Sequence, residues 1–169
     1  LFVGRFIPDK GVHLLVQAFE SVQTELKLVL VGGSPNPGSY ENEIRNTGDS
    51  RIVFAGYVYG DDTNILMKNA YAYVQPSLIE GLSPVILTVM GLGTPLVCSD
   101  IAENTFITGN NATHFTSGNI DSLAEKIKFC IDNNSEIREK AERGRIDILS
   151  RFNWDSVASQ YLEIFIKKK

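Results

Sequence analysis

The chain has 169 residues, which fits one soluble globular domain able to bury a core without disulfides or bound metals. Its formal net charge is -4, and without a run of basic residues it does not suit the phosphate backbone of nucleic acids. No apolar stretch approaches the roughly 20 residues that cross a bilayer, and no secretory leader pattern is present. These features predict a cytoplasmic protein and leave peripheral association with the cytoplasmic face of a membrane open.

The two cysteines, Cys98 and Cys130, fit a reduced compartment, where each would serve as a small buried hydrophobic residue. The first residue is Leu1 rather than Met, and it already belongs to an apolar run typical of a core strand. We therefore expect a single domain cut from a longer polypeptide.

Short apolar runs alternate with longer helical patterns along the chain. The runs are continuous rather than alternating, which is typical of strands buried on both faces of a sheet. Strands are predicted at Leu1–Val3, Leu26–Val31, Ile52–Ala55, Ala70–Val74, Leu96–Cys98 and, more weakly, Ala112–Thr116.

Helices are predicted between these strands, where apolar residues recur at helical spacing. Three further helices close the chain, at Ile120–Asn133, Ser135–Leu149 and Asn153–Lys168. The repeated strand–helix order predicts an α/β fold, with a doubly wound, Rossmann-like parallel sheet that carries helices on both faces.

Of the five segments that follow the predicted strands, four contain glycine. Sheets of this kind bind ligands beyond the carboxyl ends of their strands, and glycine lets a backbone approach a ligand closely. Ordinary turns between strands and helices also contain glycine, so glycine alone does not distinguish a ligand site from such turns. The segments are Gly4–Arg5, Gly32–Ser34, Gly56–Tyr57, Pro76–Gly81 and Ser99–Asp100.

Two cations lie near the first of these segments. Arg5 follows the first strand, and Lys10 is predicted to lie at the start of the first long helix. A cation in the first turn opposes the helix macrodipole, so its placement there favours a bound anion such as a phosphate or diphosphate. The alternative is a solvated lysine beside a surface arginine.

A second candidate site spans Ser77–Pro84. Pro84 suits the first turn of a helix, which would leave the backbone N–H groups before it free to bind an anion. The carboxylate of Glu80 would accept hydrogen bonds from hydroxyl groups, unless it caps nearby N–H groups instead. Donors for phosphate beside an acceptor for hydroxyls predict a sugar-phosphate site.

Five segments occur in the order and spacing of the glycosyltransferase family 4 C-terminal domain, which the chain resembles over nearly its whole length. They are Gly4–Gly11, Leu28–Gly33, Val53–Val58, Pro76–Gly81 and Gly93–Pro95, and Phe152–Trp154 matches the start of the last helix. The resemblance implies the C-terminal half of a GT-B enzyme, with 1–169 as a single nucleotide-sugar-binding domain. The acceptor would bind to an N-terminal domain absent from this chain.

Roles for individual residues follow from the resemblance. It implies that Arg5 and Lys10 hold the donor diphosphate and that Glu80 contacts the hydroxyls of the donor sugar, which makes these three the catalytic candidates. Tyr57 and Val58 would border the nucleobase, and Glu103 is a weaker match. The other implied donor contacts are Gly4, Gly33, Gly81 and the amides of Leu82 and Ser83.

One position departs from the family pattern. The second carboxylate of its E-x7-E motif falls on Thr88, whose neutral hydroxyl makes a weaker hydrogen bond than a carboxylate. We expect weaker binding of the donor ribose, about tenfold in affinity, unless the donor differs or the domain is a non-catalytic copy.

The expected reaction transfers a hexose-type sugar from a nucleoside diphosphate, UDP or GDP, to a hydroxyl of a glycan, lipid or small molecule. The resemblance implies retention of anomeric configuration, without a metal or a cofactor. His13 and His114 lack partners at metal-ligand spacing, and Asp61 and Asp62 are adjacent rather than a D-x-D motif. Two alternatives are a nucleotide-sugar epimerase of GT-B architecture and a non-catalytic nucleotide-sugar-binding module.

Overall fold

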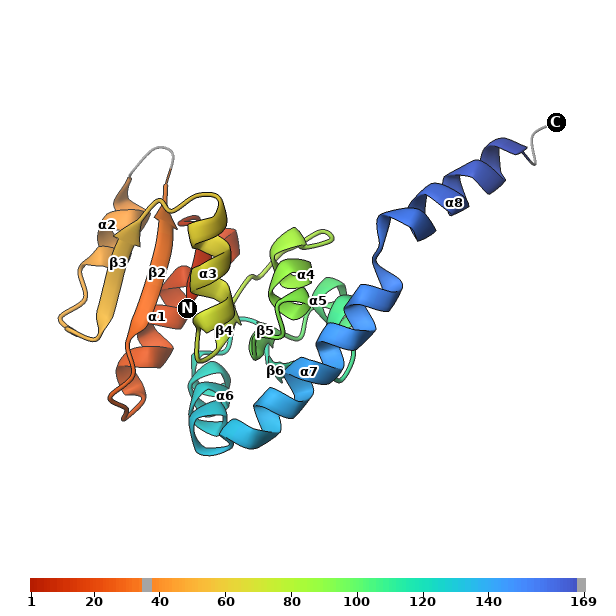
Figure 1. Ribbon diagram of the computed structural model, residues 1–169. Coiled ribbons are helices and arrows are strands. Elements are labelled where there is room, and N and C mark those ends of the chain that lie inside the picture. Colours follow the sequence, from red (N-terminus) through yellow and green to blue (C-terminus); the bar gives the residue numbers. More distant parts are fainter. Residues whose placement is uncertain (35–37, 167–169) are drawn as a thin grey trace.

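The computed structural model describes residues 1–34 and 38–166. Every strand in this part of the chain pairs in parallel with its neighbours (Figure 1). The strands are β1 (Phe2–Arg5), β2 (Leu28–Gly33), β3 (Ile52–Gly56), β4 (Tyr73–Gln75), β5 (Leu96–Ser99) and β6 (Thr113–Phe115). Each predicted strand is present, although β4 begins three residues later than predicted and β1 and β2 extend into their glycine segments.

Helices connect the strands and then close the chain. They are α1 (Val12–Ser21), α2 (Ser39–Arg45), α3 (Asp61–Asn69), α4 (Pro84–Gly91), α5 (Ala102–Thr108), α6 (Ile120–Asp132), α7 (Asn134–Arg151) and α8 (Trp154–Ile166). Pro84 opens α4 as predicted. The last two residues of the predicted final helix, 167 and 168, lie outside the described residues. None of the described helices combines the length and the hydropathy that a membrane crossing demands.

The parallel sheet is divided at its centre into two sets, ordered β1-β2-β3 and β4-β5-β6. Leu1 joins them, because its N–H donates to the carbonyl of Ala72 and its carbonyl accepts from Val74. Two residues further along, the hydroxyl of Tyr73 accepts from the N–H of Val3 and donates to the carbonyl of Val3. A side chain thus replaces the backbone ladder where the two sets separate, and the order across the sheet is β3-β2-β1-β4-β5-β6.

Helices cover both faces of the sheet, so the predicted doubly wound architecture is confirmed. A hydrophobic core lies on each face of the sheet, and consecutive residues of a strand pack into opposite cores. Leu96 packs beneath α4 and α7, whereas Val97 packs on the side of α1 and α6. Tyr73 and Val74 divide in the same way. This two-sided burial explains the continuous apolar runs in the sequence.

The last helix lies apart from this body. Figure 1 shows α8 extending away from the end of α7, and no residue of α8 is buried. Its apolar side chains are exposed, and Trp154 has 87% of its surface in contact with solvent.

The two cysteines are both free and buried, as the sequence analysis predicted for small buried hydrophobic residues. Burial raises the pKa of the Cys98 thiol to about 12.

The prediction that Lys10 lies in the first turn of the long helix is wrong. Pro8–Lys10 forms a separate 3-10 turn, and α1 begins only at Val12. Gly11 separates the two because its φ of 64° is left-handed, a conformation that other residues rarely adopt. A Cβ atom on Gly11 would also lie 2.1 Å from the carbonyl oxygen of Pro76.

We predict that Gly11→Ala lowers the free energy of unfolding by about 2 kcal/mol or more, from left-handed strain and the clash with Pro76. Gly48→Ala is a matched control, since a Cβ atom there meets nothing within 4 Å, and it should change stability by about 0.5 kcal/mol at most. Urea unfolding of the three proteins measures both values. Equal stabilities for the two variants would contradict the role given to Gly11.

Candidate functional site

The loops that follow β1 and β4 are docked against one another at the carboxyl edge of the sheet. The N–H of Leu78 donates to the carbonyl of Asp9 across 2.8 Å, and Gly11 packs against Pro76. Because β1 and β4 are adjacent and parallel, their loops leave the sheet at the same edge. The two candidate sites from the sequence are therefore parts of one site.

Lys10 and Glu80 form an ion pair across this contact. The Nζ atom of Lys10 lies 2.7 Å from Oε1 of Glu80, and the two side chains are 21% and 7% exposed. Sequence reasoning assigned the lysine to the diphosphate and the glutamate to the sugar, without placing them in contact. In the structure each of the two side chains satisfies the charge of the other.

Two further side chains donate to the same oxygen of Glu80. Nε2 of Gln75 lies 2.6 Å and Oγ of Ser77 2.7 Å from Oε1. Burial alone would raise the pKa of Glu80, but the hydrogen bonds from Lys10, Ser77 and Gln75 and the charge of Lys10 outweigh it and lower the pKa. Glu80 is therefore held ionised by side-chain donors, rather than by the backbone N–H groups of the capping alternative.

Sequence reasoning did not assign Gln75 or Ser77 to the site. A signal was present, because Gln75 is a polar residue in a strand whose other members are apolar, and its side chain is 2% exposed. A buried amide requires hydrogen-bond partners. The sequence does not show that its partner is Glu80.

We call the carboxyl edge of the sheet, with the loops after β1 to β4 and the start of α4, the rim. Its other half lies at the ends of β1, β2 and β3. Arg5 stands opposite Gly33 in the sheet register, and its exposed side chain has no ion pair or hydrogen bond within the described residues. Gly4 faces Gly32, where a Cβ atom would lie 2.0 Å from the Gly4 carbonyl. Arg5 is thus a cation available to a ligand. At position 32 only glycine fits, because any side chain would clash with the backbone of Gly4.

An aromatic pair borders this half. The ring of Tyr57 packs so closely over Gly33 that a Cβ atom there would lie 3.2 Å from it. Tyr57 also stacks on Tyr59, with ring centroids 6.0 Å apart and planes within 3°. The adjacent Val58 is half-buried, and its carbonyl accepts from Thr63. An exposed flat ring suits stacking of another planar group.

The N-terminus of α4 continues the rim beyond Glu80. Gly81 and Leu82 are exposed and Ser83 is the N-cap residue, with extended backbone and no side-chain cap. Within the described part of the chain, the N–H groups of Leu82 and Ser83 donate no hydrogen bond. These orphan donors suit an anion.

Thr88 lies on the exposed surface one turn further along α4. Its hydroxyl donates to the carbonyl of Pro84 across 3.0 Å, a local bond within the helix. Glu103, the weaker match, is brought to the same area, where it lines an open pocket of about 400 Å³ with Gly81, Leu82 and Phe106.

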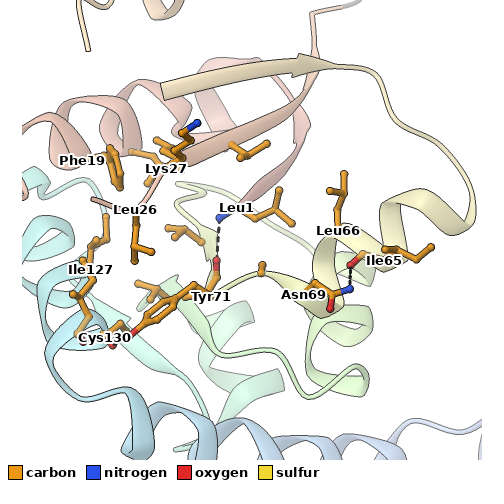
Figure 2. A pocket seen from close by; sticks show the side chains of 18 residues that line it. Leu1, Phe19, Leu26, Lys27, Ile65, Leu66, Asn69, Tyr71, Ile127 and Cys130 are labelled. Atoms are coloured by element: carbon orange, nitrogen blue, oxygen red, sulfur yellow. Dashed lines mark hydrogen bonds between the residues drawn. The ribbon is translucent and has the colours of Figure 1, made fainter. Parts of the chain in front are cut away.

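A separate apolar cavity of about 340 Å³ lies at the opposite edge of the sheet (Figure 2). Leu1, Phe19, Leu26, Tyr71 and Ile127 are among its lining residues, and no residue of the rim takes part. Each of the two histidines contacts a hydroxyl group. His13 contacts the Tyr40 hydroxyl and His114 that of Thr108, each at 2.8 Å.

Comparison with known proteins relates this chain to a family of enzymes. The chain is 26% identical over 171 residues to O-antigen chain mannosyltransferase B of Escherichia coli, covering 98% of this chain and 45% of the relative. It is 29% identical over 167 residues to MMP alpha-(1->4)-mannosyltransferase of Mycolicibacterium hassiacum, covering 95% of this chain and 41% of the relative. The chain thus spans less than half the length of these relatives.

The fold has solved counterparts. The crystal structure of Anabaena HepE in complex with UDP-glucose matches with a TM-score of 0.87 at 23% identity, covering 98% of this chain and 48% of that one. The model of the family described as glycosyl transferases group 1 matches residues 1–133. This chain therefore belongs to the glycosyl transferases group 1 family, and its fold matches the C-terminal half of GT-B glycosyltransferases.

Proposed function

We propose that this chain is the donor-binding domain of a glycosyltransferase, which moves a hexose-type sugar from a nucleoside diphosphate to an acceptor hydroxyl. The observation that carries the proposal is the meeting of Lys10 and Glu80 at one edge of the sheet, 2.7 Å apart. A cation and a carboxylate side by side match a ligand that has phosphates at one end and hydroxyls at the other.

The diphosphate is bound by cations and by backbone donors. Arg5 and Lys10 provide the charges, and the orphan N–H groups of Leu82 and Ser83 provide hydrogen bonds at the start of α4. As the bond to the sugar breaks, negative charge grows on the leaving diphosphate, and fixed donors stabilise it. These groups supply the charge that a metal ion supplies elsewhere, and we propose metal-independent transfer with retention of configuration.

Donor binding requires Lys10 to exchange one anionic partner for another. In the structure its ammonium group is paired with Glu80, and a bound diphosphate would offer a more highly charged anion beside it. Glu80 keeps the hydrogen bonds from Gln75 and Ser77 after this exchange, so its buried charge remains satisfied. The carboxylate is then free to accept hydrogen bonds from the sugar.

The nature of donor and acceptor is inferred from relatives. The two relatives described above are named as mannosyltransferases, and HepE has been crystallised with UDP-glucose, which supports a hexose donor and UDP as its nucleotide; GDP is the alternative that we propose. Because this chain spans less than half the length of these relatives, we propose that another domain seats the acceptor. The acceptor would be a glycan, a lipid or a small molecule.

A non-catalytic binding module is the second candidate. The hydroxyl of Thr88 donates to a carbonyl of its own helix, so its hydrogen bond to the donor ribose would be weaker than that of a carboxylate. Nucleotide binding without transfer or donor conversion in the intact protein would favour this candidate. Donor conversion without an acceptor would favour an epimerase.

We predict that one of UDP, GDP and ADP binds with a clear preference when calorimetry is performed on the intact protein. Arg5→Ala should weaken that binding roughly tenfold, because it removes a charge-assisted contact to the diphosphate. Lys68→Ala, which removes a cation at the C-terminal end of α3, is the control and should bind as the wild type does. Failure of all three nucleotides to bind at millimolar concentration would contradict the proposed function.

The ion pair also makes stability depend on pH. Folding lowers the pKa of Glu80, so its contribution is complete above the ordinary glutamate pKa and is lost as the pH falls through the lowered value. We predict that Glu80→Gln costs about 1.5 to 3 kcal/mol at neutral pH and much less in acid. Urea unfolding at both pH values measures the difference.

Glu125→Gln serves as the control for this effect, because Glu125 pairs with Lys126 on the surface and is 72% exposed. Exposed pairs contribute little, so this variant should remain within about 0.5 kcal/mol of the wild type. A cost of Glu80→Gln that stays constant with pH would show that the ionised carboxylate does not stabilise the fold.

A further inference from the structure

Buried polar side chains connect Glu80 to the centre of the sheet. Nε2 of Gln75 donates to Glu80, and Oε1 of Gln75 lies 3.3 Å from the hydroxyl of Tyr73, whose single proton is shared between this oxygen and the nearer carbonyl of Val3. The same hydroxyl is anchored on both backbone groups of Val3, where β1 and β4 separate. Tyr73 and Gln75 are 0% and 2% exposed. Polar groups are costly in such a position, so this connection calls for a reason beyond packing.

The donors and acceptors on these side chains fix the orientation of the Gln75 amide. The side-chain amide of Gln75 has two N–H bonds, which donate to Oε1 of Glu80 and to Oγ of Ser77. The single hydroxyl proton of Ser77 donates to Oε1 of Glu80 as well. Because a carboxylate only accepts, the nitrogen of Gln75 must face Glu80 and its oxygen must face Tyr73. The amide therefore has one orientation.

All the donors converge on one oxygen of Glu80. Lys10, Gln75 and Ser77 donate to Oε1, whereas Oε2 accepts no hydrogen bond within residues 1–34 and 38–166. The three donors differ in kind. Lys10 is partly exposed and borders the proposed diphosphate site, while Gln75 and Ser77 are buried and cannot turn towards a ligand.

We propose that Gln75, with Ser77, is a positioning residue that fixes Glu80 so that Oε2 faces the hydroxyls of the donor sugar. This inference rests on the proposed function. Gln75 acts through the carboxylate and does not contact the donor. The nucleotide and the diphosphate lie against other residues, so only the sugar part of donor recognition depends on Gln75.

The test compares a nucleotide with its nucleotide sugar. Calorimetry on the intact protein would use UDP, UDP-glucose, GDP and GDP-mannose with the wild type, Gln75→Leu and, as a surface control, Gln23→Leu. Gln75→Leu should weaken binding of the preferred nucleotide sugar roughly tenfold and leave binding of the corresponding diphosphate unchanged. Gln23 is exposed, and its variant should match the wild type in both.

Ser77→Ala is a second test in case Gln75→Leu does not fold, since it removes one donor to Glu80 with the loss of a single oxygen atom. It should weaken nucleotide-sugar binding in the same selective way, to a smaller extent. If the wild type binds a nucleotide sugar and the variants bind it equally well, or lose nucleotide and nucleotide sugar alike, the inference is wrong and the proposed function stands. If the wild type binds none of the four compounds, both fail.

Discussion

The site depends on the parallel contact between β1 and β4. Leu1 supplies it through two backbone hydrogen bonds, and it brings together Lys10 and Glu80, which are 70 positions apart. From this contact the chain adds β2 and β3 in one direction and β5 and β6 in the other. At this reversal of strand order the helices that follow β1 and β4 lie on opposite faces of the sheet, and the two loops that lead to them meet at the carboxyl edge. The location of the site thus follows from strand order.

The charged groups at this edge of the sheet suit a ligand that has both phosphates and hydroxyls. A net charge of -4 describes the whole chain, yet the rim carries Arg5 without an ionic partner among the described residues and Lys10 beside a single carboxylate. Glu80 remains charged in a largely buried position because three donors compensate its desolvation. The polar side chains of the site therefore satisfy one another, and we propose that a donor diphosphate replaces Glu80 as the partner of Lys10.

Sequence patterns predicted the architecture well, because burial on both faces produces continuous apolar runs and Pro84 marks a helix start. They failed where tertiary contact decides. The turn at Pro8–Lys10 depends on Gly11 fitting against Pro76, and the pairing of Lys10 with Glu80 depends on strand order. No local pattern indicated that Tyr73 replaces a backbone ladder or that Gln75 donates to Glu80. Side-chain direction inside a sheet is a property of the assembled fold.

The central claim is that the loops after β1 and β4 together bind a nucleoside-diphosphate sugar. A crystal structure of the intact protein with the preferred nucleotide sugar tests it most directly. We predict the diphosphate against Arg5 and the N-terminus of α4, Nζ of Lys10 moved from Glu80 to a phosphate oxygen, and a sugar hydroxyl on Oε2 of Glu80. A nucleotide sugar bound elsewhere, with the pair of Lys10 and Glu80 unchanged, would contradict the account.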